Sequence, residues 1–429
     1  MLPQAASSIS RFSTMRIAFL TPEFATESYF AGGLAQYLGR LVPALVERGH
    51  DVEVFVTSEK EDEFSYHGAQ VRRVLPHRLL SLRLVNGLLP FLGRRRFATA
   101  QQMCRIAKGL DHALRRRHSV SRFDIVQAAS WMASGFFSVR RPVAPVVVRV
   151  SSYGPMLDAA AGVRITADRR IMWALELAAM RRAAAVYAPS RFLAHQISSE
   201  MQFPVRVVPP PFYIDTRAED PSAAQTVAPF RPYLFFFGRV SRYKGAGLLA
   251  EAVRPLLAGL PDFHLVVAGP DGQDEAGRRL LALAHACPHR VHYLGTLPPQ
   301  RLRPVIRAAH AVVLPSLADN LPNTCLEAMG LGQLVIGPDG VSFDELIADG
   351  ESGLLFTLGS AASLRDAIVR VWRMPDEIRA QVGQRATARM DMLAPRRASA
   401  ELESFYEQVL DKAARRPDSR TSGRSQGSA

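Results

Sequence analysis

The sequence predicts an α/β protein made of two doubly wound domains, each with a parallel sheet covered by helices on both faces. Short apolar segments that suit buried parallel strands alternate along the chain with longer amphipathic segments that suit helices. The alternation runs twice, and a stretch rich in Pro, Ala and polar residues at 209–232 separates the two runs. The length of 429 residues, 48% of them hydrophobic, supplies enough apolar material for two cores.

The elements of the two runs can be placed in order. The first run has expected strands RIAFL at 16–20, DVEVFV at 51–56, DIVQ at 124–127, PVVVRV at 145–150, AVYA at 185–188 and VRVV at 205–208. The second begins with YLFFF and has expected strands at 233–237, 263–268, 291–294, 311–314 and 334–337. Helices are expected between these strands, and ligands of such folds sit at the carboxyl ends of the strands.

These patterns predict a division of the chain. Residues 360–413 are expected to be helical, and the last helix is expected to pack back on the first domain. Met15 is a candidate for the true initiator. The expected parts are a disordered leader at 1–14, an N-terminal Rossmann-like domain at 15–210, a linker at 211–232, a C-terminal Rossmann-like domain at 233–395, a C-terminal helix at 396–414 and a disordered tail at 415–429.

Composition excludes several classes of protein. No run approaches the ~20 apolar residues of a membrane span, and the first residues lack the apolar region of a secretory signal. The three cysteines, Cys104, Cys287 and Cys325, have neither metal-site nor redox spacing, so we expect reduced thiols in a cytoplasmic protein. The chain also has no Asp-x-Asp motif that could hold a metal, and no metal site is expected.

The net charge of +14 is unevenly distributed. The first 217 residues carry +13 and the remainder carries +1, which suggests that the first half faces an anionic partner. No zinc spacing, helix-turn-helix signature or RNP-type motif supports nucleic acid as that partner. The stretch at 74–97 mixes Leu, Val and Phe with basic residues, which suits an anionic membrane surface as well as an ordinary helical hairpin with a solvated basic face.

Two glycine-containing motifs follow expected strands. Gly32 and Gly33 lie between the first strand and the first long helix, where backbone N–H groups can approach an anion, although paired glycines are also common in plain turns. In GRVSRYKG at 238–245, Arg239 can bind two phosphate oxygens and Lys244 adds a second cation. A solvated basic turn is the alternative interpretation. A phosphate clamp is favoured because the segment joins a core strand to a helix.

A third motif spans residues 314–356. Asp319 lies in the loop after an expected strand, Pro322 suits the first turn of a helix, and Glu327 falls within that helix. Two carboxylates at this spacing can accept hydrogen bonds from hydroxyl groups at the two ends of an extended ligand. An acidic surface helix would account for the pair equally well.

Taken together, these motifs resemble those of retaining family 4 glycosyltransferases, which have the two-domain GT-B fold. The resemblance extends from about Met15 to Leu410 and rests on the order of GGL at 32–34, GR…KG at 238–245, Asp319-x7-Glu327 and GVSFDELIADGESGLLF at 340–356. It implies a hexosyl transfer from a nucleotide diphosphate sugar, with the donor mainly in the second domain and the acceptor mainly in the first. A glycan, a lipid-linked molecule or another anionic molecule would be the acceptor, in cell-envelope polysaccharide or glycoconjugate synthesis.

The resemblance also implies roles for individual residues. Arg239 and Lys244 would bind the donor's diphosphate, and Glu327 would bind the ribose hydroxyls. Asp319 stands where the family usually has a glutamate that contacts the donor sugar, and it is shorter by one methylene. Other residues expected to contact the donor are Gly32, Gly33, Gly238, Gly340, Val341 and Ser342. No metal or cofactor is required in this interpretation.

The chain departs from the family in the first domain. Many members have a cleft histidine after the strands that correspond to DIVQ and VVVRV, whereas this chain offers Gln127, Ser130, Ser151, Ser152 and Tyr153. Ser151 and Ser152 are kept as candidate cleft residues, with core packing as the alternative. Two other functions stay open at this point: a sugar-nucleotide epimerase on the same fold, and a non-catalytic partner subunit.

Overall fold

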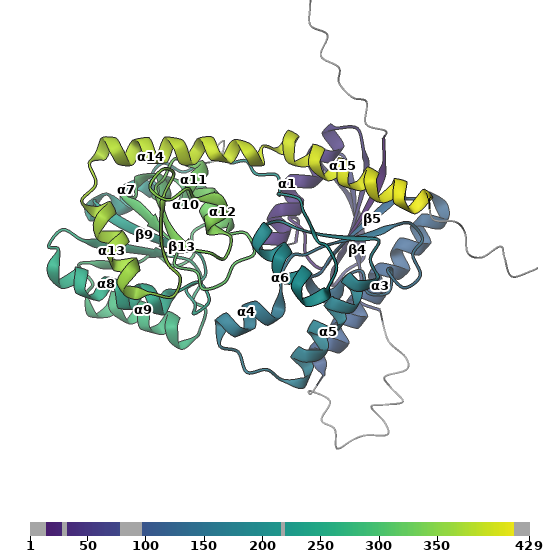
Figure 1. Ribbon diagram of the computed structural model, residues 1–429, viewed down its shortest axis with the longest axis horizontal. Coiled ribbons are helices and arrows are strands. Elements are labelled where there is room, and N and C mark those ends of the chain that lie inside the picture. Colours follow the sequence, from purple (N-terminus) through teal and green to yellow (C-terminus); the bar gives the residue numbers. More distant parts are fainter. Residues whose placement is uncertain (1–13, 28–31, 78–96, 216–218, 416–429) are drawn as a thin grey trace, which may run out of the picture. The chain divides into compact units, whose positions relative to one another are not determined.

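The computed structural model describes residues 14–27, 32–77, 97–215 and 219–415 (Figure 1). The expected leader, except residue 14, the tail from residue 416 and most of the 74–97 stretch lie outside the described residues. The chain groups into two compact units. The N-terminal unit contains Met1–Arg149, Leu175–Val186 and Ser399–Ala429, and the C-terminal unit contains Val150–Ala174 and Tyr187–Ala398. The domain boundaries expected from the sequence stay a prediction.

The fold class predicted from the sequence is confirmed by two mainly parallel sheets. The first has the strand order β3-β4-β2-β1-β5-β6-β7-β8, and within it only the β3–β4 pair is antiparallel among the pairings of described residues. Its strands are β1 (Arg16–Thr21), β2 (Asp51–Thr57), β3 (Asp62–Tyr66), β4 (Ala69–Val74), β5 (Ile125–Ala129), β6 (Val146–Arg149), β7 (Ala185–Ala188) and β8 (Arg206–Val207).

The second sheet has the order β11-β10-β9-β12-β13-β14, and its described pairings are parallel. Figure 1 shows β9 and β13 enclosed by helices on both sides. The strands are β9 (Tyr233–Phe237), β10 (His264–Ala268), β11 (Val291–Tyr293), β12 (Ala311–Val313), β13 (Val335–Asp339) and β14 (Leu354–Thr357).

Helices fill the connections between the strands. Those before β9 are α1 (Gly33–Glu47), α3 (Ala98–Val120), α4 (Gly154–Ala161), α5 (Ala167–Arg182), α6 (Arg191–Met201) and α7 (Ala223–Val227), with 3-10 turns η1 (Trp131–Ala133) and η2 (Ala228–Phe230). Those after β9 are α8 (Ala246–Gly259), α9 (Glu275–Ala286), α10 (Pro299–Ala308), α11 (Asn323–Gly330), α12 (Phe343–Leu346), α13 (Ala361–Trp372), α14 (Asp376–Arg389), η3 (Met390–Leu393) and α15 (Pro395–Ala414).

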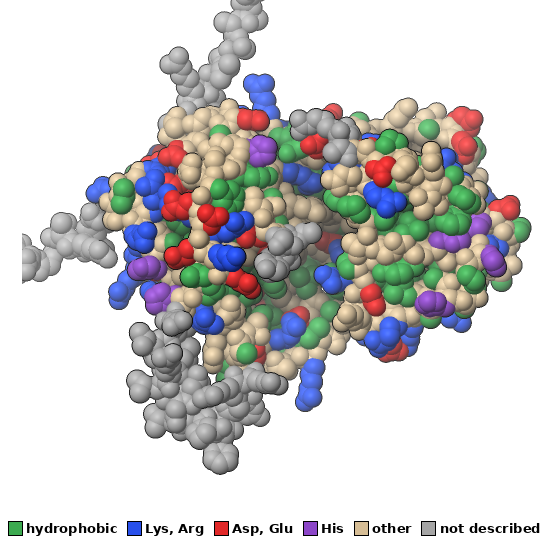
Figure 2. All heavy atoms as spheres, turned by 180° about the vertical axis from the view of Figure 1, so that it is seen from behind, with side chains coloured by type: hydrophobic (Ala, Val, Ile, Leu, Met, Phe, Trp, Pro, Cys, Tyr) green, Lys and Arg blue, Asp and Glu red, His purple; other side chains and the backbone are tan. Residues whose placement is uncertain are grey.

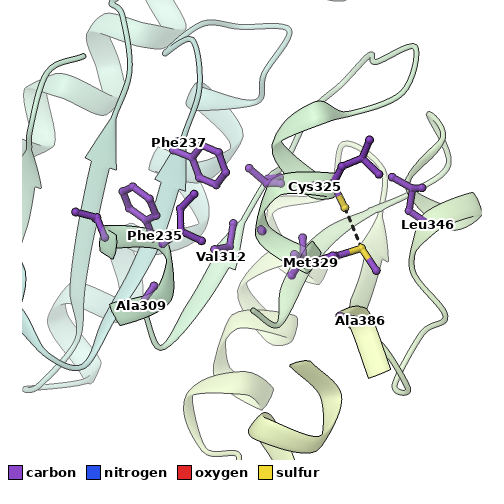
Figure 3. Close-up of a cluster of buried hydrophobic side chains, with 14 of the residues drawn as sticks. Phe235, Phe237, Ala309, Val312, Cys325, Met329, Leu346 and Ala386 are labelled. Carbon is purple, nitrogen blue, oxygen red and sulfur yellow. Dashed lines mark hydrogen bonds between the residues drawn. The ribbon is translucent and has the colours of Figure 1, made fainter. Parts of the chain in front are cut away.

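The core of the C-terminal unit follows from the two-residue period of β9. Phe235 and Phe237 belong to one buried cluster, whereas Leu234 and Phe236 belong to a second cluster on the opposite face of the sheet. The first cluster includes the buried face of α11, on which the Cys325 thiol donates a hydrogen bond to the Met329 sulfur at 3.5 Å (Figure 3). Because this packing holds α11 against β9 and β12, it also fixes the opposite face of α11.

In the N-terminal unit, α15 is anchored by a buried carboxylate. Glu403 is fully buried, accepts a bidentate hydrogen bond from Arg48, and lies 2.9 Å from His50 Nε2. Further along the helix, the Tyr406 hydroxyl donates to Gln127 Oε1 at 2.5 Å. Gln127 lies on β5, so α15 is bonded to the middle of the first sheet.

Candidate active site

The GRVSRYKG segment begins where β9 ends and leads into α8. Gly238 has a φ of +117° and Gly245 has a φ of +79°, which are left-handed conformations that suit glycine. A Cβ atom on Gly245 would lie 1.8 Å from the carbonyl oxygen of Pro315, in the loop after β12. The Leu317 amide also donates to the Tyr243 carbonyl at 2.8 Å. The turn at Lys244 is therefore pressed against the loop that carries Asp319.

The two residues of this segment that are predicted to bind phosphate, Arg239 and Lys244, differ in their surroundings. Arg239 is exposed, whereas the Lys244 side chain is 20% exposed and its Nζ lies 2.5 Å from Asp319 Oδ2. Burial alone would lower the pKa of Lys244, but the Asp319 carboxylate and Tyr243 more than offset this, so the pKa of Lys244 lies above its ordinary value. The ammonium is thus charged at neutral pH and held in one place.

Asp319 is tied down at both of its oxygens. Oδ2 pairs with Lys244, and Oδ1 accepts a hydrogen bond at 3.0 Å from the amide of Asn320. The Asn320 side chain donates in turn to the Ser151 carbonyl at 2.9 Å. The structure therefore brings Ser151, one of the candidate cleft residues, to the loop of Asp319 through its backbone; Ser152 follows it and is half-buried.

Glu327 lies on the partly exposed face of α11. Thr324 precedes it by one helical turn on the same face, whereas Cys325, Leu326, Ala328 and Met329 are buried. A Cβ on Gly238 would lie 3.5 Å from the Thr324 methyl group. This face of α11 therefore adjoins the start of the GRVSRYKG segment.

The turn before α12 is strained. Gly340, Val341 and Ser342 have φ values of +109°, +45° and +70°, and a left-handed conformation at a β-branched residue such as Val341 costs of order 1–3 kcal/mol. The Ser342 hydroxyl lies within hydrogen-bond distance of the Asn320 carbonyl, at 2.9 Å, and of Ser190 Oγ, at 3.0 Å. Among the described residues, neither Val341 nor Ser342 uses its amide as a donor. Within the described part of the chain, the turn thus holds two N–H groups without a hydrogen-bond acceptor next to the Asp319 loop, at residues that are themselves buried.

Two sequence profiles match the chain. The profile described as Glycosyltransferase Family 4 matches residues 31–216, and the one described as Glycosyl transferases group 1 matches residues 231–374. A D-inositol 3-phosphate glycosyltransferase of Nocardia farcinica is 27% identical over 380 residues, which cover 83% of this chain and 80% of that protein.

Solved structures share the fold. Sucrose-phosphate synthase from Thermosynechococcus elongatus has a TM-score of 0.74 at 19% identity, over 92% of this chain and 100% of that chain. Anabaena Alr3699/HepE in complex with UDP and glucose has a TM-score of 0.65 at 17% identity, over 92% and 99%. The chain belongs to the family 4 glycosyltransferases. It is a hexosyltransferase of the GT-B fold that uses a nucleotide sugar donor, which disfavours the epimerase and the non-catalytic subunit.

Two further glycines that are predicted to contact the donor of this glycosyltransferase, Gly32 and Gly33, lie in the N-terminal unit. Gly33 is the first residue of α1, and the Ala35 amide in the first turn donates to Glu23 Oε1 at 3.1 Å. A Cβ on Gly32 would lie 2.7 Å from the same oxygen. Burial raises the pKa of the Glu23 carboxyl, and the amides of Ala35 and Leu34 oppose this rise. A carboxyl group of the chain itself therefore occupies the start of α1 in this structure.

Sequence reasoning missed several residues that shape the site. Glu23 had a detectable signal, because an acid two residues beyond a core strand can reach the following helix. Ser190, Asn320 and Glu345 had none, because their partners lie far away in the sequence, at separations of 130 residues or more for several of their contacts. No group of three or more potential metal-binding side chains occurs in the described part of the chain.

Some of the arginines in the first half form ion pairs with a buried carboxylate of the same unit. Glu53 is buried on β2 and pairs with Arg16, Arg72 and Arg117, and these contacts hold its pKa below the ordinary value although burial alone would raise it. On the face shown in Figure 2, acidic and basic side chains are interspersed. No helix in the described ranges combines the length and apolar character that crossing a bilayer requires.

Proposed function

We propose that this glycosyltransferase moves a hexosyl group from a nucleotide diphosphate sugar to a hydroxyl of a phosphorylated polyol, with retention of anomeric configuration. The observation that carries the proposal is the charged Lys244, held by Asp319 at the carboxyl ends of β9 and β12, with Arg239 exposed beside it. The acceptor class is supported by the name of the relative from Nocardia farcinica and by the charge of +13 on the first 217 residues.

The leaving group is the part of the reaction that these cations serve. Breaking the bond to the sugar leaves a nucleoside diphosphate, whose added charge forms at the phosphate oxygen that bonded the sugar. Arg239 binds two phosphate oxygens through its planar guanidinium, and Lys244 places a point charge between the phosphate and Asp319. Lys244 is fixed by Asp319 before the reaction, so it stabilises this charge without reorganisation, which is the role a metal ion has in other transferases.

The donor sugar and nucleoside are recognised by the loops around this pair. Asp319 accepts from a sugar hydroxyl, and Glu327 accepts from the ribose hydroxyls. The amides of the Gly340–Ser342 turn donate to the sugar or phosphate, and Gly238 lets the backbone approach the donor. Gly32 and Gly33 of the N-terminal unit serve the donor phosphate, and Ser151 and Ser152, which belong to the C-terminal unit, are candidates for contacts with the acceptor.

The proton of the acceptor hydroxyl needs no protein base in this proposal. The departing phosphate oxygen accepts it as the acceptor oxygen attacks the anomeric carbon from the face that the leaving group vacates. One bond to the sugar forms, one breaks, and the proton ends on the nucleoside diphosphate. Configuration at the anomeric carbon is retained because both events occur on one face.

Calorimetry with UDP, GDP and ADP tests the donor site, using the wild type and Lys244→Ala, with and without EDTA. We expect one nucleotide to bind, EDTA to have no effect, and the substitution to weaken binding. Failure of all three nucleotides to bind the folded wild type would overturn the donor site, and loss of binding in EDTA would overturn metal independence.

A transfer assay then tests the acceptor. The nucleotide sugar that matches the preferred base is incubated with inositol phosphate, unphosphorylated inositol, or an extract of lipid-linked saccharides in vesicles, and product is detected by mass spectrometry. We expect transfer to the phosphorylated polyol. Transfer only to the lipid-linked or glycan material would instead support cell-envelope polysaccharide synthesis and attachment to an anionic membrane surface.

A further inference from the structure

The start of helix α6 contacts both segments that we propose bind the donor, the Asp319 loop and the segment of the Gly340–Ser342 turn. It belongs to the C-terminal unit, and its N-cap residue Ser190 is 1% exposed. The Ser190 hydroxyl accepts from the Leu193 amide at 3.2 Å and donates to the Asn320 carbonyl at 2.6 Å. The start of this helix is therefore bonded to the residue directly after Asp319.

Glu345 binds the same helix end from the other loop. Its Oε2 accepts from the Arg191 amide and its Oε1 from the Phe192 amide, both at 2.8 Å. These are the first two helical residues of α6, whose amides have no partner within the helix and favour a carboxylate. The Arg191 guanidinium is 3.6 Å from Glu345 but its side chain is 77% exposed, so the two amides carry the interaction.

Glu345 lies on α12, three residues after the strained turn at Gly340–Ser342. Ser342 contacts Ser190 and Asn320, so the turn is fastened to the start of α6 on one side by Ser342 and on the other by Glu345. A left-handed conformation at Val341 persists only where surrounding contacts impose it. The carboxylate of Glu345 is the charged group that binds the α6 amides, while the Arg389 guanidinium donates to the carbonyls of Glu345 and Leu346 at the end of α12.

We propose that Glu345 is a positioning residue for the donor: by binding the N-terminus of α6, it holds the Gly340–Ser342 turn with its free amides beside the Asp319 loop. The inference rests on the proposed function, because it assumes that the donor's phosphate or sugar binds those amides. Glu345 itself, 15% exposed and with both oxygens engaged by α6, does not contact the donor. Its loss acts through the fraction of molecules in which the turn is correctly formed.

The test compares Glu345→Gln with Asp344→Ala. Glutamine keeps the size of the side chain but loses the charge. Its single oxygen can accept a hydrogen bond from one of the two α6 amides, and the other amide loses its acceptor. Asp344 is the matched control, because it precedes Glu345 on the same short helix, is exposed, and makes no side-chain hydrogen bond or ion pair with the described residues. Ser190→Ala is a second variant that weakens the same junction.

We expect the dissociation constant of the preferred nucleoside diphosphate to rise about tenfold in Glu345→Gln, by loss of one charge-assisted hydrogen bond, and not in Asp344→Ala. The KM for the nucleotide sugar rises with it, while kcat at saturating donor falls less. Hydrogen exchange at Phe343, whose amide bonds to the Gly340 carbonyl at 3.1 Å, is faster in Glu345→Gln and in Ser190→Ala than in the control.

Two results would overturn the inference by itself: unchanged nucleotide affinity in Glu345→Gln, or unchanged exchange at Phe343, while the wild type binds a nucleotide. A lower thermal midpoint with normal affinity would show that Glu345 has only a structural role. Failure of the wild type to bind any nucleotide would instead overturn the proposed function and this inference together.

Discussion

Replacing Lys244 with alanine does two things to the donor site. It removes a cation from the diphosphate, and it leaves the Asp319 carboxylate, whose side chain is 11% exposed, without its partner. Lys244 Nζ lies 2.5 Å from Asp319, and a charge-assisted bond from Nζ to phosphate measures about 2.8 Å. Because the N–H bonds of an ammonium group diverge at about the tetrahedral angle, the carboxylate and phosphate oxygens are about 4 Å apart, and at an effective dielectric constant of about 20 two unit charges at that distance repel by about 4 kcal/mol, an upper bound for this partly exposed pair.

This geometry predicts that Lys244→Ala and Asp319→Asn do not have additive effects on nucleotide affinity. Lys244→Ala weakens nucleoside diphosphate binding by at least a hundredfold, because a charge-assisted bond worth about 2 kcal/mol is lost and the repulsion is added. Adding Asp319→Asn removes the repulsion while keeping the shape of the side chain, and restores about tenfold of the affinity. Asp319→Asn alone does not improve binding, since Lys244 then loses the carboxylate that orients it.

Isothermal titration calorimetry on the four proteins of this cycle measures the coupling, with the nucleotide that the wild type prefers. A double variant that binds no better than Lys244→Ala would refute the reasoning, because Asp319 would then exert no field on the phosphate. Improved binding by Asp319→Asn alone would also contradict it, since the carboxylate would then only repel the ligand.

Three further predictions concern the scaffold of the site. Gly245→Ala should lower the thermal midpoint and abolish nucleotide binding, because its Cβ would lie 1.8 Å from the Pro315 oxygen at a φ of +79°; normal binding by this variant would contradict the close approach. Burial alone would raise the pKa of Glu403, but hydrogen bonds from His50 and Arg48 keep this pKa below its ordinary value. The contribution of Glu403 to the free energy of unfolding is therefore complete above the ordinary Glu pKa, and it is lost as the pH falls through the lowered pKa of the folded state. Thermal midpoints should therefore fall more steeply between pH 5 and pH 3 in the wild type than in Glu403→Gln, and parallel curves would contradict this. Burial raises the pKa of the Cys325 thiol well above its ordinary value, so iodoacetamide at pH 8 should leave Cys325 unmodified in the native protein; mass spectrometry that finds it alkylated before unfolding would refute the packing in Figure 3.

The alternation of elements was predictable because buried parallel strands are written almost entirely in apolar residues. YLFFF at 233–237 and VVVR at 146–149 are strands within a residue of the expected bounds. The β3–β4 hairpin at 62–74 was missed, because its residues are mainly polar and charged and carry no continuous apolar run. The linker expected at 211–232 contains the short helix α7 in its second half, where Ala223 and Val227 are buried by tertiary contacts.

Only the parts of the site that belong to local sequence motifs could be predicted. Residues Arg239, Lys244 and Asp319 could be named because each follows a recognisable strand, but their pairing depends on the close approach of Gly245 to Pro315, which no local pattern encodes. Ser190 and Glu345 depend in the same way on α6 packing beside loops that follow it by 130 to 154 residues. Sequence periodicity reports burial along one element, and it does not report which two elements meet.

The Glu23 carboxyl group at the start of α1 affects how that helix end can bind an anionic ligand. The Glu23 carboxyl group already accepts a hydrogen bond from an amide in the first turn of α1, so a phosphate that bound at this helix end would have to displace it. The binding energy of such a ligand would be the difference between its own hydrogen bonds to the helix and those that Glu23 gives up. A helix end that the protein itself already caps therefore binds a phosphate more weakly than an uncapped one.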